Sequence, residues 1–263
     1  MQKSFSVVGN LKMNLLSREE VDQYLTVLSR EAEGKRYVYV KGVLCPSFPH
    51  LSAFDRLPES IRKGAQNLFP EKSGAYTGEV SPVMLKNEGV EYVILGHSER
   101  RQYAGETDTI IHTKVLSALR YHLIPIVCIG ETDEERRAEE TERVLELQVR
   151  TIFSGLSKLQ AEKVIIAYEP RWAIGTDRLP TTEELLSVRV FLKKVLTGAF
   201  DGETAQRVAV LYGGSVKSSF LPAVTFEAEM DGVLVGRESL FPYEVVKMMG
   251  LLEEEGRRRH EEK

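Results

Sequence analysis

The sequence has few cysteines, little net charge and no long apolar run. Cys45 and Cys128 are its only cysteines and lie far apart, which argues against a disulfide framework and is typical of a reducing compartment. The net charge of −4 argues against a dedicated nucleic-acid binder, but a small anion could still bind through local charge. No window approaches the ~20 apolar residues of a membrane span, and the N-terminus lacks a signal-peptide stretch. We therefore expect a cytoplasmic protein that binds neither nucleic acid nor membrane.

Several catalytic signatures are also missing. The five histidines show no H-x-x-x-H or H-x-H spacing, so the sequence predicts no metal site. It contains no G-x-S-x-G nucleophile elbow. It also has no G-x-G-x-x-G after a strand and no G-x-x-x-x-G-K-[ST] loop, which argues against the common nucleotide-binding folds.

What the sequence does contain is a regular alternation of short β-branched apolar runs and longer amphipathic segments. Such runs are typical of parallel strands with both faces buried, and the amphipathic segments between them predict helices. About eight strand–helix units in 263 residues predict a single-domain α/β fold, a (β/α)8 barrel, with an open doubly wound sheet as the alternative. The expected strands are residues 5–8, 37–44, 65–67, 92–95, 126–129, 164–168, 208–212 and 233–235.

The expected barrel domain spans residues 1–252. Capping boxes at residues 17–20 and 181–184 predict two of its helix starts. Residues 253–263 are almost all charged, and we expect them to form a solvated helix end and tail rather than a binding arm.

Polar residues directly follow most of the expected strands. In a barrel of this kind the active site lies at the C-terminal ends of the strands. A carboxylate and a histidine on different strands can divide base and acid roles, and glycine-rich turns before helices can bind phosphate through backbone N–H groups. Proton abstraction next to a carbonyl of a phosphorylated substrate needs only these parts. The strand-end residues are Asn10, Lys12, Gln66, Asn67, His97, Cys128, Glu131, Glu169, Gly213, Gly214, Ser215, Gly236 and Arg237.

Five of these segments together resemble the triosephosphate isomerase family. Residues 167–176, AYEPRWAIGT, are similar to the family's catalytic glutamate and lid, and residues 96–101, GHSERR, to its electrophile segment. Residues 9–14, 74–79 and 212–216 resemble its first active-site loop, dimer loop and phosphate loop. The matches occur in the family's order and cover almost the whole chain.

The resemblance implies a fold, an activity and roles for individual residues. The family interconverts dihydroxyacetone phosphate and glyceraldehyde 3-phosphate without a cofactor, through an enediolate. Glu169 is implied as the general base, neutral His97 as the electrophile and Lys12 as the cation that offsets substrate charge. Asn10 would assist, and Glu99 would orient its neighbours, although an ion pair with a neighbouring arginine would explain Glu99 nearly as well.

The resemblance also implies how the substrate is held and covered. The phosphate would bind to backbone N–H groups, namely those of Gly175, Ser215, Gly236 and Arg237. The lid would exclude water, because an exposed enediolate phosphate eliminates its phosphate. Its implied residues are Pro170, Arg171, Trp172, Ala173, Ile174, Gly175 and Thr176.

Assembly and lid motion are the other implied properties. A homodimer is implied through the Thr77 loop. Arg171 occupies a hinge position that is usually apolar, and Asp177 stands where glycine is usual, so either residue could alter lid opening. Arg237 stands where a second glycine is frequent; this is safe only if its φ is negative.

Two other functions are compatible with a phosphate-binding barrel. An aldolase would need a Schiff-base lysine at a strand end, and an epimerase of the ribulose-phosphate type would need metal ligands. Lys12 is the only strand-end lysine that stands out. A non-catalytic phosphosugar-binding protein would be expected to have lost Glu169, His97 or Lys12, and all three are present.

Overall fold

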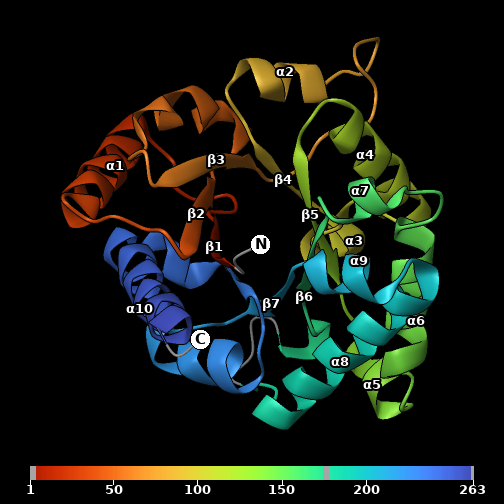
Figure 1. Ribbon diagram of the computed structural model, residues 1–263. Helices are drawn as coiled ribbons and strands as arrows, with labels where there is room; N and C mark the ends of the chain where they lie inside the picture. The colour runs from red at the N-terminus through yellow and green to blue at the C-terminus, as the bar shows by residue number, and fades with distance from the viewer. Residues whose placement is uncertain (1–3, 174–177, 262–263) are drawn as a thin grey trace.

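Eight parallel strands close into a barrel in the computed structural model, which describes residues 4–173 and 178–261 (Figure 1). The strands pair in sequence order, and β1 pairs with β8 to complete the ring. The (β/α)8 fold and its single domain are thereby confirmed. The strands are β1 (Phe5–Asn10), β2 (Val40–Cys45), β3 (Ile61–Ala65), β4 (Tyr92–Leu95), β5 (Ile124–Ile129), β6 (Ile165–Tyr168), β7 (Val210–Gly214) and β8 (Gly232–Val235).

Helices surround this ring and fill most of the connections between strands (Figure 1). The α-helices are α1 (Arg18–Ala32), α2 (Pro82–Asn87), α3 (Ser98–Tyr103), α4 (Asp108–Arg120), α5 (Asp133–Arg137), α6 (Thr141–Ile152), α7 (Lys158–Ala161), α8 (Thr182–Ala199), α9 (Gly202–Arg207) and α10 (Pro242–Glu261). Short 3-10 turns are η1 (Phe48–Arg56), η2 (Arg171–Ala173), η3 (Ser218–Phe220) and η5 (Arg237–Leu240), and η4 (Ala223–Glu227) is π-helical. Within the described residues, no helix is long and apolar enough to cross a membrane.

Both helices start where the sequence predicts, but only the capping box at residues 181–184 forms in full. Thr181 accepts from the Glu184 N–H, and the Glu184 carboxylate accepts from the Thr181 N–H in return. Ser17 likewise accepts from the Glu20 N–H, but the Glu20 carboxylate bonds to the N–H of Leu16, one residue before the cap. These bonds satisfy amide groups that the first helical turn leaves without a partner.

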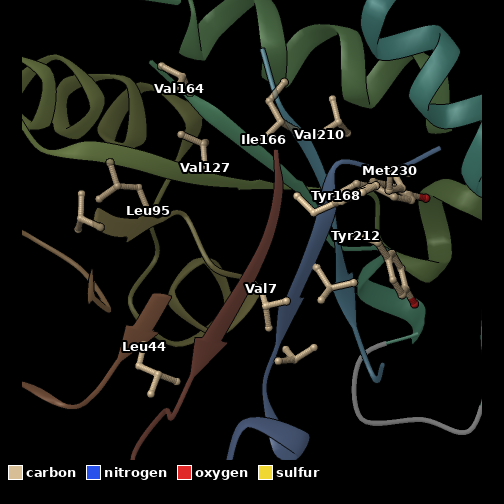
Figure 2. Close-up of a cluster of buried hydrophobic side chains, with 14 of the residues drawn as sticks. Val7, Leu44, Leu95, Val127, Val164, Ile166, Tyr168, Val210, Tyr212 and Met230 are labelled. Carbon is tan, nitrogen blue, oxygen red and sulfur yellow. The ribbon is translucent and has the colours of Figure 1, made fainter. Parts of the chain in front are cut away.

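Two apolar layers stabilise the barrel. Alternate strand residues, Val8, Ile94 and Leu211 among them, form a cluster that contains only strand residues and therefore fills the barrel interior. The other strand residues, such as Leu95 and Ile166, pack outward against the helices (Figure 2). Both faces of each strand are thus buried, which explains why most strands read as continuous apolar runs.

The third strand differs from the prediction. It spans Ile61–Ala65 rather than residues 65–67. Arg62 and Lys63 lie inside it and break the apolar pattern, so periodicity alone points too far along the chain. Lys63 is buried because its ammonium donates to Glu88 O at 2.7 Å and pairs with Asp55.

The charged C-terminal segment continues a helix instead of forming a separate tail. Helix α10 runs without a break across residue 253 to Glu261. Glu253 is buried and accepts from the N–H groups of Val38 and Tyr39 at 2.9 and 2.8 Å. Glu255, also buried, pairs with Arg258 and Arg259. Glu253 and Glu255 thus make contacts that composition does not reveal, whereas residues 254, 257, 258, 260 and 261 are exposed, as expected of a solvated helix end.

Candidate active site

A cavity of about 1170 Å³ opens at the C-terminal ends of the strands. Residues at the C-terminal ends of four different strands meet in the wall of this cavity. Asn10 ends β1, His97 follows β4, Glu169 follows β6 and Gly236 follows β8. The barrel thereby brings together residues that are up to 226 positions apart in the sequence, Asn10 and Gly236 being the extremes. The cavity is where the fold class places an active site.

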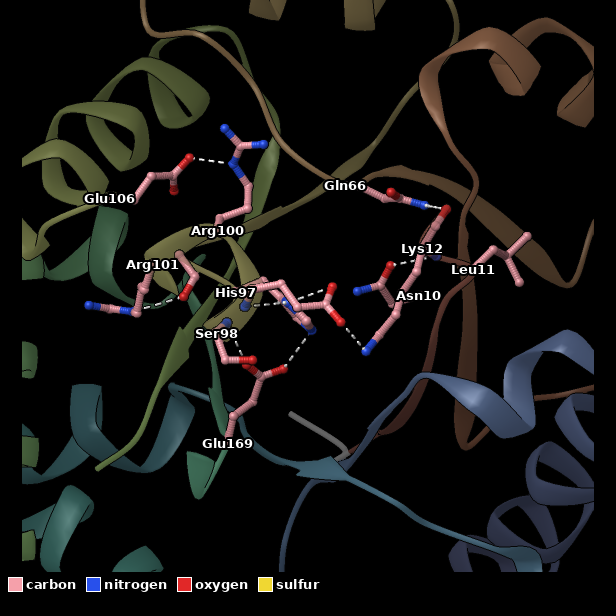
Figure 3. Close-up of polar contacts among 12 residues, drawn as sticks. Asn10, Leu11, Lys12, Gln66, His97, Ser98, Arg100, Arg101, Glu106 and Glu169 are labelled. Atoms are coloured by element: carbon pink, nitrogen blue, oxygen red, sulfur yellow. Dashed lines mark hydrogen bonds and ion pairs between the residues drawn. The ribbon is translucent and has the colours of Figure 1, made fainter. Parts of the chain in front are cut away.

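Glu169 lies buried at the centre of this arrangement, with a side chain that contacts the β4–α3 segment. Its Oε2 accepts from the Ser98 N–H at 3.2 Å, and its Oε1 lies 3.4 Å from His97 Nε2 (Figure 3). Only 4% of Glu169 is exposed. A carboxylate this deep, within reach of a histidine and a cavity, has the position that a general base needs.

Two glycines make room for Glu169. A Cβ on Gly213 would lie 2.5 Å from Glu169 Cγ, and a Cβ on Gly130 would overlap Glu169 O. Gly213 lies within β7, and Gly130 directly follows β5. Gly213, which the sequence suggests as a phosphate turn, thus has a different structural role, because its missing side chain leaves the space that the carboxylate occupies.

His97 is the N-cap residue of α3. Its Nδ1 accepts from the Glu99 N–H at 3.3 Å. An accepting ring nitrogen carries no proton, so this contact favours the neutral tautomer with the proton on Nε2. That nitrogen faces Glu169, and the ring can donate a hydrogen bond without carrying a charge.

Lys12 is held at the cavity wall by contacts from the ends of β1 and β3. Its backbone has a φ of +52°, an uncommon value for a side-chain-bearing residue. Asn10 Oδ1 accepts from the Lys12 N–H at 3.1 Å, and Gln66 Nε2 donates to Lys12 O at 2.9 Å. The sequence marks Gln66 as a strand-end residue without indicating its role; its position explains how Lys12 keeps this backbone conformation.

Glu99 pairs with Lys12 and not with a neighbouring arginine. Glu99 Oε1 lies 2.7 Å from Lys12 Nζ. Arg100 pairs instead with Glu106, and Arg101 pairs with Asp108 at 2.7 Å. The alternative explanation of Glu99 as a partner of Arg100 or Arg101 is therefore wrong, because both arginines point to other carboxylates.

The glycine-rich segments after β7 and β8 also line the cavity. Gly214, Ser215, Gly236 and Arg237 are all part of its wall. The expectation that the glycine-rich turn of β7 leads directly into a helix, which would start at Ser215, is wrong, since the next turn, η3, begins at Ser218 with Lys217 as its cap. Gly236 does cap η5.

Arg237 fits without backbone strain. It is the first residue of the η5 turn and is not among the positive-φ residues, so the condition for a side chain at this position is met. Its side chain is exposed at the cavity rim. The side chain of Arg237 therefore does not prevent the backbone N–H of the same residue from binding phosphate.

The first residues of the expected lid form the η2 turn beside Glu131. The Arg171 N–H donates to Glu131 O at 3.0 Å, and Trp172 Nε1 donates to Glu131 Oε1 at 2.8 Å. Tyr168 Oη lies 3.1 Å from the same oxygen. Glu131 is fully buried, and its place after β5 is the only sequence signal that could have found it. Ile174, Gly175, Thr176 and Asp177 lie outside the described residues.

Cys128 packs in the barrel interior behind Glu169. Burial raises the pKa of its thiol well above the ordinary value, and the nearby charge of Glu169 raises it further. A thiol that stays protonated is a poor nucleophile, so Cys128 is a packed core residue and not a candidate nucleophile.

Thr77 lies away from this cavity. It is exposed in a loop between β3 and α2, and it is not part of the cavity wall of its own chain.

The described residues contain no cluster of three or more histidine, cysteine, aspartate or glutamate side chains that could hold a metal ion.

Comparison with known proteins identifies relatives of the chain. The family model described as "Triosephosphate isomerase" matches residues 5–252. A protein of that name from Dictyoglomus turgidum is 46% identical over 210 residues, which are 79% of this chain and 84% of the relative. Another from Clostridium botulinum (strain Loch Maree) is 43% identical over 236 residues, or 89% and 94% of the two chains. A third, from Rhodopirellula baltica, is 42% identical over 242 residues, or 91% and 94%.

Proposed function

The chain belongs to the triosephosphate isomerase family, and we infer from this membership that its cavity interconverts dihydroxyacetone phosphate and D-glyceraldehyde 3-phosphate. The reaction belongs to glycolysis and gluconeogenesis. One observation about the site carries the residue assignment: the Glu169 carboxylate and the His97 ring, from separate strands, lie 3.4 Å apart at the wall of one cavity with Lys12.

We propose that Glu169 moves a proton between the two substrate carbons. It removes a proton from the carbon next to the carbonyl, and the electron pair forms the double bond of an enediolate. Returning the proton to the neighbouring carbon gives the isomeric carbonyl compound, so no electrons leave the substrate and no cofactor is needed. The family is itself a known example of a glutamate base working with a neutral histidine.

His97, Lys12 and Asn10 would stabilise the charge that develops on the substrate oxygens. The neutral His97 ring can donate from Nε2 and move protons between the two oxygens. The Lys12 ammonium supplies a positive charge, and Glu99, its partner at 2.7 Å, would orient it before substrate enters. The Asn10 side chain supports the Lys12 backbone through the bond from Lys12 N–H.

Backbone N–H groups would bind the phosphate. Gly175, Ser215, Gly236 and Arg237 are proposed for this role, and the last three line the cavity. The lid would cover residues 170–176 and exclude water from the enediolate. Pro170, Arg171, Trp172 and Ala173 form its start, where Trp172 is fixed to Glu131.

We also propose that the protein is a homodimer and works in the cytoplasm. Thr77 would contact the partner's active site from its exposed loop. The two cysteines, both buried and unpaired, fit a reducing compartment.

The aldolase alternative is not favoured by the site. A Schiff-base lysine reacts as the neutral amine in a pocket that disfavours its charge. Lys12 instead lies 2.7 Å from the Glu99 carboxylate, so its amino group is held in an ion pair rather than in an apolar pocket.

The assignment of Glu169 is tested by removing its charge. Purified protein should convert glyceraldehyde 3-phosphate, measured by coupling dihydroxyacetone phosphate formation to NADH oxidation. Glu169→Gln keeps the size of the side chain and its contact with the Ser98 N–H, but it cannot take the proton, so kcat should fall by about three orders of magnitude or more. Glu203→Gln, on the exposed end of α9, is the matched control and should retain full activity.

The possible results separate the function from the residue role. A wild-type protein without activity above the uncatalysed rate contradicts the proposed reaction. An active wild type with an equally active Glu169→Gln variant contradicts only the role of Glu169.

A further inference from the structure

We propose that Arg136 and Arg178 are positioning residues that fix Trp172, and with it the first residues of the proposed lid, in the position described here. Their guanidinium groups lie over the indole ring, with Cζ 3.8 Å and 5.4 Å from the ring centroid. Both distances are within the range of a cation–π interaction, for which tryptophan is the best aromatic partner. The proposal rests on the proposed function, because the lid that Trp172 anchors belongs to that function.

The ring is therefore fixed in two directions. Glu131 binds its edge through the 2.8 Å bond from Nε1, and Arg136 covers its face. Trp172 is only 6% exposed although it lines the large active-site cavity. We call Glu131, Arg136 and Arg178 the tryptophan cradle.

Ion pairs hold the two arginines of the cradle. Arg136 pairs with Glu184, the capping residue in the first turn of α8. Arg178 lies 3.4 Å from Asp133, the first residue of α5. Arg136 itself belongs to α5, so this short helix contributes to both contacts. The ring is thus tied through α5 to the N-terminus of α8.

Arg136 acts from outside the active site. It lines a second cavity of about 430 Å³, together with Glu184 and Tyr168, and it is not part of the active-site wall. Substrate therefore has no direct contact with Arg136. Any effect of this residue on the reaction must pass through Trp172 or its neighbours.

The cradle has a thermodynamic consequence for substrate binding. In this family the lid closes over bound substrate, so contacts at its first residues can affect substrate binding. Contacts that stabilise one lid arrangement over the other change apparent binding by the same factor. Loss of one exposed cation–π contact corresponds to a factor of about 2 to 5.

Trp172 is the only tryptophan of the chain, so its fluorescence reports the cradle directly. Arg136→Ala uncovers the ring face, and its acrylamide quenching constant should rise at least about twofold over wild type. The KM for glyceraldehyde 3-phosphate should change about 2- to 5-fold without a matching change in kcat. Arg136→Lys keeps the charge but not the flat group and should show intermediate values.

Arg150→Ala is the matched control. Arg150 is an exposed arginine on α6, paired with Glu146 at 2.7 Å, and it is not among the arginines over the Trp172 ring. This variant should leave quenching, KM and kcat unchanged. If Arg136→Ala does not fold, Glu184→Gln serves in its place, since it releases the guanidinium while its amide oxygen can still accept from the Thr181 N–H.

An Arg136→Ala protein with the quenching constant of wild type overturns the proposal. So does a raised quenching constant with an unchanged KM, because the ring would then move without affecting substrate binding. In both cases an active wild-type protein leaves the proposed function intact, whereas an inactive wild type contradicts that function itself.

Discussion

At the scale of single residues, the position of the Glu169 carboxylate, the proposed base, depends on a neighbouring residue that has no side chain. Gly213 is the neighbour whose Cβ would lie 2.5 Å from Glu169 Cγ. A distance below 3.0 Å is too short for carbon atoms, so one of the two groups would have to move. Gly213 lies within β7, where the backbone is fixed by pairing with β8, and the Glu169 side chain would therefore give way.

Gly213→Ala should reduce activity more than stability. A displacement of the carboxylate by about an ångström misplaces the base, and we expect kcat to fall about 100-fold. Steady-state kinetics and thermal unfolding measure the two effects separately. A variant with wild-type kcat would show that Glu169 does not need this space.

Gly198→Ala provides the matched control. Gly198 lies in α8 with open space where its Cβ would be. Alanine is the better helix former by about 0.5–1 kcal/mol, so this variant should keep its kcat and unfold at a slightly higher temperature.

At the scale of elements, a buried ion-pair network fixes α3, the short helix whose N-cap residue is His97. Glu106, after α3, pairs with Arg100 from α3 and with Lys114 from α4. Lys114 also donates to Asn67 Oδ1 at 2.8 Å. The network ties α3 to α4 and to the end of β3, and the N-cap of α3 is His97.

The network makes stability depend on pH. Burial by itself would raise the pKa of Glu106, but hydrogen bonds from Lys114 and Arg100 outweigh burial and lower it. A carboxyl group with a lowered pKa in the folded state contributes its full stability above its unfolded pKa of about 4.3. That contribution is lost as the pH falls below this value.

Glu106→Gln should therefore destabilise the protein in a pH-dependent way. At pH 7 it leaves the buried Lys114 without its charge partner, and the free energy of unfolding should fall by about 3 kcal/mol. At about pH 3.5, below the unfolded pKa of glutamate, the difference from wild type should shrink. Urea unfolding at both pH values measures it, with Glu203→Gln as the exposed control. Equal differences at the two pH values would contradict this account.

At the scale of the whole molecule, the long loop between β3 and α2 has little contact with its own barrel. Residues 71–79 are all exposed, Tyr76 and Thr77 among them, and the loop projects from one side of the ring (Figure 1). The contact between the Phe69 and Tyr76 rings, with centroids 4.4 Å apart, gives it internal order. An ordered loop without its own packing partner fits the proposed role in an interface.

The dimer proposal predicts a mass of about twice the chain's 29.7 kDa in sedimentation equilibrium. Thr77→Arg would bury an unpaired charge at the interface, so this variant should sediment nearer the monomer mass and lose activity. The same substitution at Thr26, exposed on α1, should leave mass and activity unchanged. A fully active wild type with the monomer mass would exclude this role for Thr77.

Much of this organisation can be predicted from the sequence. Apolar runs alternating with amphipathic segments predict parallel strands joined by helices, because each pattern fixes which faces a segment must bury, and about eight such units favour the barrel over an open sheet. Motifs such as residues 167–176 identify the family, and with it the expected roles of Glu169, His97 and Lys12. The third strand is the exception, since Arg62 and Lys63 interrupt its apolar pattern.

Other features were decided only by the tertiary structure. The partner of Glu99 is Lys12, 87 positions away, and not an adjacent arginine. Glu131 contacts Trp172 across 41 positions, and the charged end of α10 satisfies amides near residue 38. The physical reason is the same in each case. Local sequence determines which segments become strands and helices, whereas a charged or polar side chain pairs with whatever group the closed barrel brings within reach.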